Sequence, residues 1–166
     1  MSKSLDSLNI ITAENTERRK LGEPRIAAQR IDIRLVEGLH FEASIHGFSF
    51  PIDEPPERGG QSQGLPPLAH FLAGAASCLM TQYLKLAKEK KVEISSMNTI
   101  ARGHFDRRVG GAFTDIEYNI KIESPSDTGT IKAIAAEAET MCYAHNTLKK
   151  TVAMKTRLTL NNSLVP

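Results

Sequence analysis

The sequence lacks tryptophan, and aromatic residues make up only 5% of its 166 residues. No charge of one sign dominates either, because 21 basic residues stand against 19 acidic ones, for a formal net charge of +2. Proteins that bind nucleic acid usually combine a strongly basic surface with aromatic side chains on which bases stack. The composition therefore argues against a nucleic-acid partner.

Long apolar runs are also absent. No stretch approaches the roughly 20 apolar residues that a membrane-spanning helix needs, and the first 20 residues show no apolar segment followed by a small-residue cleavage site. We therefore expect a cytoplasmic protein without a membrane partner. The length suffices for one domain with a real core, so we expect an arm or short helix over residues 1–24 and a single domain over 25–166.

Cysteine is scarce as well, since only Cys78 and Cys142 occur. Two cysteines are too few for the disulfide framework of a small secreted domain. In a reducing cytoplasm such a pair is either structural or redox-active, and composition leaves both readings open.

Alternating apolar residues predict three short antiparallel strands between residues 26 and 52. In the first of them, over 26–36, Ile31, Ile33 and Leu35 form the apolar face. A loop rich in proline and glycine follows over 53–67. The next helix, from Pro67 to about Lys90, is apolar around nearly its whole circumference in its first half, so we expect that half to be buried on most sides.

In the second half of the chain, the apolar pattern predicts strands over 93–105 and 113–123 and a helix from Ser126 or Asp127 through Cys142. A break at 145–147 and a last strand over 152–160 follow. The order is βββα and then ββαβ. This order indicates an α+β fold in which two central helices pack against antiparallel sheets. A meander of three short strands leaves an apolar face exposed, which favours a homodimer.

The surroundings of Cys78 allow two interpretations. At 100° per residue, the helix face that carries Cys78 also carries Phe71, Gly74 and Ala75 on one side and Gln82 on the other. Small side chains beside a thiol leave room for another helix or for a substrate, so these four residues form the candidate substrate pocket. Free cysteine is often only a small buried hydrophobe, and the 64 residues between the two cysteines do not show whether they meet.

Other chemistries have less support in the sequence. Cys142 and His145 have a C-x-x-H spacing and His70 lies on the other predicted helix, but structural zinc sites normally use two such pairs, so we expect no metal. No G-x-S-x-G elbow and no phosphate-binding G-K-[ST] loop occur, which argues against a hydrolase, a nucleotide-binding protein and a bound cofactor.

Three segments resemble the OsmC/Ohr family, which comprises thiol-dependent hydroperoxide reductases and less characterised OsmC-like relatives. They are the loop DEPPERGGQSQGLPP, the run LAGAASC that ends at Cys78, and the later CYAHNTL that begins at Cys142. The resemblance covers residues 25 to about 161 and includes the spacing of the two cysteines. It implies an OsmC-like fold and an intertwined homodimer.

The resemblance also implies a reaction. Cys78 would attack an organic hydroperoxide to give a sulfenic acid, Cys142 would resolve it to a disulfide, and an external dithiol would restore both thiols. Arg58 matches the arginine that pairs with the thiolate in this family. The alternative is a non-catalytic relative that binds an apolar small molecule at the dimer interface.

Two positions depart from the family pattern. Peroxidases of this family hold the arginine with a glutamate early in the cysteine helix, where this sequence has Leu68 or Ala69. Tyr143 stands where a proline usually follows the second cysteine. A glutamate of the preceding loop, Glu54 or Glu57, would have to hold Arg58 instead.

Overall fold

The computed structural model describes residues 27–106, 108, 110–150, 158–160 and 163–165, so the expected arm over 1–24 lies outside the described residues. The chain divides into two compact units, with the boundary between Gly64 and Leu65, and each is described by itself. Helices and antiparallel sheets occur together, which confirms the predicted α+β class. Among the described helices, none combines the length and the apolar character needed to cross a membrane.

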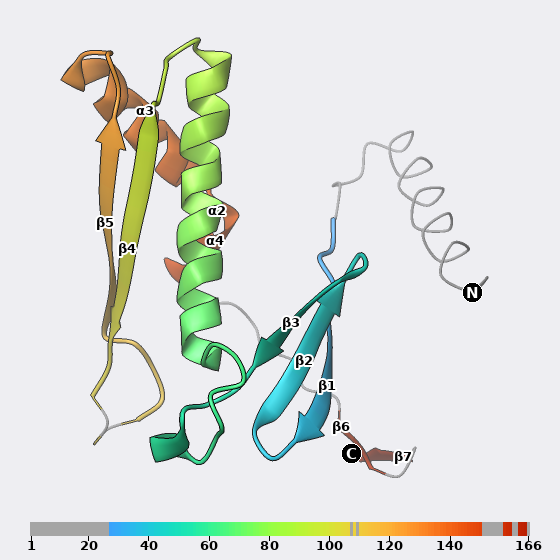
Figure 1. Ribbon diagram of the computed structural model, residues 1–166. Coiled ribbons are helices and arrows are strands. Elements are labelled where there is room, and N and C mark those ends of the chain that lie inside the picture. The colour runs from blue at the N-terminus through green and yellow to red at the C-terminus, as the bar shows by residue number, and fades with distance from the viewer. Residues whose placement is uncertain (1–26, 107, 109, 151–157, 161–162, 166) are drawn as a thin grey trace, which may run out of the picture. The chain divides into compact units, whose positions relative to one another are not determined.

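The first unit contains a three-stranded antiparallel meander of β1 (Asp32–Glu37), β2 (His40–Ile45) and β3 (Phe48–Ile52), shown in Figure 1. The predicted first strand was too long at its start. Strand β2 turns back after Ile45, so its ladder with β1 begins only at the pair of Asp32 and Ser44.

The apolar face of β1 is present but uncovered. Ile31, Ile33 and Leu35 are 46%, 59% and 61% exposed, although the alternation predicted a dry face. The strand register places Ile33 beside Ala43 and Phe50, so these residues share one side of the sheet. Nothing in the described chain covers this row on β1.

The loop after β3 folds around a buried carboxylate. Asp53 is 1% exposed, and its Oδ2 accepts hydrogen bonds from the backbone N–H groups of Gln61 (2.9 Å) and Gln63 (3.0 Å). These bonds, that from Gln63 first, lower the pKa of Asp53. A Cβ at Gly60 would overlap the carbonyl oxygen of Glu54, so the loop closes tightly only with glycine there. The proline- and glycine-rich segment is therefore a compact turn that carries Arg58 in the short 3₁₀ helix η1 (Pro56–Arg58).

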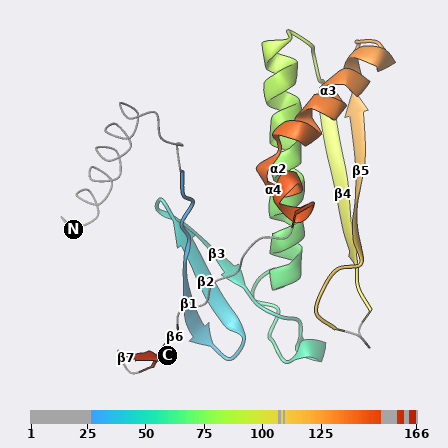
Figure 2. The same ribbon diagram turned by 180° about the vertical axis from the view of Figure 1, so that it is seen from behind.

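The second unit packs two helices against a hairpin. Helix α2 (Pro67–Glu89) runs beside the hairpin of β4 (Ser96–His104) and β5 (Asp115–Glu123), and α3 (Thr128–Met141) crosses α2 and the hairpin on one side (Figures 1 and 2). The short α4 (Tyr143–Leu148) returns along α2. The buried core comes from α2, α3 and the residue between α3 and α4: Leu79, Tyr83, Leu86, Ala87, Ile134, Ala138 and Cys142.

The first half of α2 is not buried on most sides, contrary to the prediction. Leu68 and Phe71 are each 43% exposed, and Ala73 and Gly74 are exposed as well. Ala75 and Ala76 are the buried residues of this half, and within the second unit α2 contacts α3, α4 and β4. The sequence correctly indicated that this half of α2 is apolar, but within the described residues only one of its faces is packed.

The break near the second cysteine also differs from the prediction. Residues 145–147 belong to α4, and the chain breaks at Cys142, whose backbone is extended (φ −78°, ψ 113°). Its sulfur accepts a hydrogen bond from the His145 backbone N–H at 3.5 Å. Cys142 thus ends α3 and caps α4 with its sulfur, as a serine or threonine oxygen would.

The last predicted strand, over 152–160, is described only in part. Residues 151–157 lie outside the described residues, and β6 covers Leu158–Leu160. It pairs antiparallel with an additional strand that was not predicted, β7 (Ser163–Val165).

Candidate functional site

The two cysteines meet inside the second unit. The Sγ atoms of Cys78 and Cys142 lie 3.5 Å apart, although 64 residues separate them, and both thiols are free. Helix α2 supplies Cys78, and the junction between α3 and α4 supplies Cys142. A disulfide bond is about 2.05 Å long, so 3.5 Å is a non-bonded contact that a small side-chain movement could close.

The surroundings of the two sulfurs are unequal. Cys142 is 0% exposed, whereas Cys78 is half-buried. Burial raises the pKa of Cys142, and the neighbouring Cys78 raises it further, against a partly opposing hydrogen bond from the His145 N–H. The raised pKa favours the protonated form of Cys142, which donates to the Cys78 sulfur, and Cys78 is the more accessible of the two.

A cavity of about 440 Å³ lies within the same unit. Its wall comes from the start of α2, from β5 and the residues just before it, and from α4 and the residue after it: Phe71, Phe113, Thr114, Asp115, Ile116, Tyr118, His145, Leu148 and Lys149. Tyr118 also packs against the core that contains Cys142, as Cys78 does. Burial first, and then the two cysteines, raise the pKa of Tyr118. Tyr118 therefore belongs both to the cavity wall and to the residues packed against the core that contains Cys142.

The predicted pocket residues only partly coincide with this cavity. Phe71 lines it, but Gly74, Ala75 and Gln82 do not. Gly74 faces open space, because no heavy atom lies within 4 Å of where its Cβ would be. Ala75 and Gln82 are buried along α2.

Sequence reasoning missed Tyr118 and His145 as part of the site. Tyr118 was visible as one of the alternating apolar residues of β5, but the alternation does not indicate a cavity. His145 belongs to the C-x-x-H spacing, a pattern that indicates metal binding rather than a cavity wall.

That spacing serves a different purpose. The backbone N–H of His145, rather than its ring, contacts the Cys142 sulfur. The ring Nε2 is shielded from solvent without a hydrogen-bond partner, and the nearest carboxylate oxygen, on Glu139, is 3.8 Å away. Among the residues that the structure describes, no group of three or more histidine, cysteine or carboxylate side chains could hold a metal ion.

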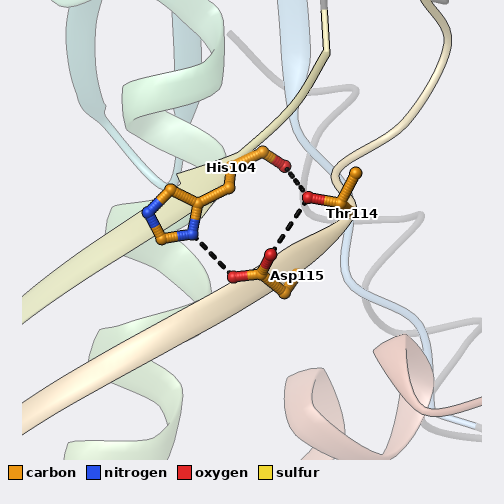
Figure 3. A network of polar contacts seen from close by, with 3 residues as sticks. All are labelled: His104, Thr114 and Asp115. Carbon is orange, nitrogen blue, oxygen red and sulfur yellow. Dashed lines mark hydrogen bonds and ion pairs between the residues drawn. The ribbon is translucent and has the colours of Figure 1, made fainter.

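A polar network lies at the edge of the cavity (Figure 3). His104 Nδ1 lies 2.6 Å from Asp115 Oδ1, and the Thr114 hydroxyl lies 3.0 Å from both Asp115 Oδ2 and the His104 carbonyl oxygen. The contacts with His104 and then Thr114 lower the pKa of Asp115. Both carboxylate oxygens are therefore engaged, and the network closes the base of the loop that joins β4 to β5.

Comparison with known proteins identifies the family. Residues 59–157 match the family model of the OsmC-like proteins. The chain belongs to this family. A hydroperoxide reductase of Mycoplasma genitalium is 29% identical over 139 residues, which is 80% of this chain and 96% of that relative.

Solved structures of OsmC-like proteins have the same fold. An OsmC-like protein from Mycoplasma pneumoniae aligns with a TM-score of 0.66 and 24% identity, over 74% of this chain and 88% of its own. An organic hydroperoxide resistance protein from Legionella pneumophila aligns with a TM-score of 0.59 and 16% identity, over 76% and 92%. At these identities the likeness concerns the fold alone.

In this OsmC-like protein the candidate arginine has a carboxylate partner from its own loop. Arg58 Nη1 lies 3.2 Å from Glu54 Oε2, with the side chains 44% and 22% exposed. Leu68 and Ala69 lie in the first turn of α2 and offer no carboxylate. Of the two glutamates that could substitute, Glu54 therefore makes the ion pair and Glu57 does not.

Proposed function

We propose that this OsmC-like protein is a thiol-dependent peroxidase that reduces organic hydroperoxides, with Cys78 as the attacking thiol, Cys142 as the resolving thiol and Arg58 as the activating residue. The observation that carries the proposal is the 3.5 Å contact between the two free sulfurs, one half-exposed and one buried. The name of the Mycoplasma genitalium relative, a hydroperoxide reductase, supports the same reaction.

The reaction balances with the groups present. The Cys78 thiolate attacks the terminal oxygen of the hydroperoxide, the O–O bond breaks, and the alkoxide that leaves takes up a proton to become an alcohol. The Cys142 thiol then attacks the sulfenic sulfur, so a disulfide forms and water leaves. An external dithiol of the cytoplasm, where we place the protein, reduces the disulfide by exchange and returns both thiols.

The direct test is thiol loss upon addition of cumene hydroperoxide. We expect two thiols to disappear per chain, and mass spectrometry of the digested protein should find a bridge between Cys78 and Cys142. In the Cys142→Ser variant we expect a sulfenic acid on Cys78, trapped by dimedone. If neither a bridge nor a sulfenic acid forms, the protein is not a peroxidase of this type.

A second candidate function is the binding of an apolar small molecule without catalysis. The cavity of about 440 Å³ favours it, since the rings of Phe71 and Phe113 stack along its wall with centroids 5.9 Å apart. Under this alternative the cysteines are structural, so Cys78→Ser would leave both ligand affinity and folding unchanged.

We further propose that the protein is a homodimer whose contact includes the apolar face of the meander. Ile33, Leu35 and Phe48 lie on this face and are 59%, 61% and 76% exposed. Exposed apolar rows of this kind usually mark an interface, and a second copy is the partner that the family resemblance implies.

Sedimentation equilibrium tests the dimer. We expect about twice the chain mass of 18.2 kDa. We expect the double substitution Ile33→Asp with Leu35→Asp to give monomers, because it puts charges on the face that the proposed dimer would bury. Ser49→Asp, on an exposed residue of β3, serves as the control and should remain dimeric. Monomeric wild-type protein at micromolar concentration would contradict the proposal.

A further inference from the structure

Two cavities of the second unit have one lining residue in common. Besides the main cavity of about 440 Å³, an apolar recess of about 310 Å³ is lined by Leu68, Phe105, Gly111, Ala112 and Phe113. Phe113 is the residue common to both linings. Phe113 therefore borders both spaces.

The ring of Phe113 is held from both sides. It stacks on Phe71, which lines the main cavity, with centroids 5.9 Å apart and planes at 21°. It meets Phe105, which lines the apolar recess, edge to face with centroids 5.8 Å apart. Such aromatic contacts favour one ring orientation.

A glycine makes room for this ring. A Cβ on Gly103, in β4, would overlap the Phe113 ring. The backbone of Gly103 is not in the left-handed region that favours glycine, so backbone conformation does not account for the glycine. Glycine in the interior of a strand weakens it, and close approach of another group is a common reason for its presence. Gly103 therefore provides the space in which the Phe113 ring sits.

The backbone beside the ring is fixed too. The Thr114 N–H donates to the His104 carbonyl oxygen at 2.7 Å, and the network of His104, Thr114 and Asp115 in Figure 3 ties the same two strand ends together. Gly103 itself pairs with Ile116 in the ladder, so the Phe113 ring folds back over the glycine from the end of the hairpin that this network holds together.

The two cavities differ in chemistry. The main cavity has polar groups from Thr114, Asp115, His145 and Lys149, and its residue Tyr118 also packs against the core that contains Cys142. The described residues that line the apolar recess include no charged one. A hydroperoxide held in the main cavity would place its organic group against the rings of Phe71 and Phe113. The apolar recess, which Phe113 also lines, offers further space for a longer apolar group.

We propose that Phe113, seated over Gly103, closes the main cavity from the apolar recess and so determines the size of the organic group that the site accepts. The inference rests on the proposed function, because the organic group is that of the hydroperoxide. It makes Phe113 a specificity-determining residue and Gly103 a positioning residue that acts through it.

The Phe113→Ala variant tests this with hydroperoxides of increasing size. We expect the ratio of kcat/KM for linoleic acid hydroperoxide to kcat/KM for tert-butyl hydroperoxide to rise about tenfold, as burial of roughly two further methylene groups would give. Gly103 lines neither cavity, but Gly103→Ala should also change the ratio, because the added methyl group displaces the Phe113 ring. Ile100→Ala, 55% exposed on the same strand and part of neither lining, is the control that should leave the ratio unchanged.

A binding experiment separates this inference from the proposed function. In the Cys78→Ser background, Phe113→Ala should strengthen binding of 1-octanol relative to 2-phenyl-2-propanol, measured by calorimetry, whether or not the wild-type protein is a peroxidase. Phe113→Leu, which keeps much of the apolar volume, should give a smaller shift in the same direction and guards against misfolding. An unchanged ratio for a folded variant in both the kinetic and the binding experiment would overturn the inference.

Discussion

Replacing Cys78 with serine is expected to reduce hydroperoxide consumption to background. Loss of a catalytic nucleophile typically costs roughly 10³-fold or more in rate, and a serine oxygen can neither ionise appreciably at neutral pH nor pass through a sulfenic acid. Cys78 is half-buried and serine is close to it in size, so the fold should persist. Steady-state assays with cumene hydroperoxide and a dithiol reductant measure the loss, and thermal denaturation verifies folding.

Two matched variants make this result specific. Ser77→Ala changes the exposed residue before Cys78 and should keep full activity. The Ser77 hydroxyl donates a hydrogen bond to the Gly74 carbonyl oxygen of the same helix. Cys142→Ser should keep the first turnover but slow those that follow, because the sulfenic acid on Cys78 then lacks its resolving thiol. If Cys142→Ser abolished the first turnover while Cys78→Ser did not, the proposed roles of the two cysteines would be reversed.

Local patterns predicted the elements of the second unit well. The alternation of Ile116, Tyr118, Ile120 and Ile122 identified the inner face of β5, and these four residues are half-buried while their neighbours are exposed. The helix expected from Pro67 to about Lys90 ends at Glu89. Periodicity was sufficient here, because β4 and the helices of the same unit pack against the residues that it predicts to be buried.

The periodicity of apolar residues could not indicate which part of the protein packs on an apolar face. Leu68 and Phe71 on α2 and Ile33 and Leu35 on β1 have the pattern of buried residues, yet they are exposed in the described chain. A pattern records that a face is apolar, but it does not reveal whether the face packs within the chain or against another one.

The candidate site depended on tertiary contacts. The sequence predicted a helix that extends through Cys142, but not that the Cys142 sulfur caps α4 or lies against Cys78. The cavity wall combines Phe71 with residues from β5 and α4 that lie more than 40 positions later, and no local spacing connects them. The packing of α2 against β4, α3 and α4 brings these parts together.

The second large effect is expected at Arg58, and its size follows from what thiolate formation alone can contribute. A cysteine thiol with a pKa of ~8.5 is about 3% ionised at pH 7, so lowering that pKa to ~6 would raise the thiolate fraction about 30-fold. Intrinsic nucleophilicity would fall about 13-fold with a Brønsted slope of ~0.45, which leaves a net gain of roughly two- to threefold. An arginine that only promoted ionisation would therefore contribute little.

We accordingly expect Arg58→Met to reduce kcat/KM for cumene hydroperoxide by about 10²- to 10³-fold, as loss of a group that stabilises a developing negative charge does. In the proposed reaction the charge develops on the leaving oxygen of the hydroperoxide. Arg58→Lys should recover only part of the activity, because an ammonium keeps the charge but lacks the planar fork of donors. A reduction of only two- to threefold for Arg58→Met would mean that Arg58 acts on the thiolate alone.

The glutamates of the loop provide the matched pair for this prediction. Glu54→Gln removes the carboxylate that lies 3.2 Å from Arg58 and should reduce kcat/KM about tenfold, since the guanidinium remains but is less well positioned. Glu57→Gln, in the same exposed turn without a contact to Arg58 in the structure, should have no such effect. Equal effects of the two substitutions would point to the general charge of the loop instead. A selective effect of Glu54 would explain how the chain manages with Leu68 and Ala69 at the positions where its relatives are expected to place a glutamate.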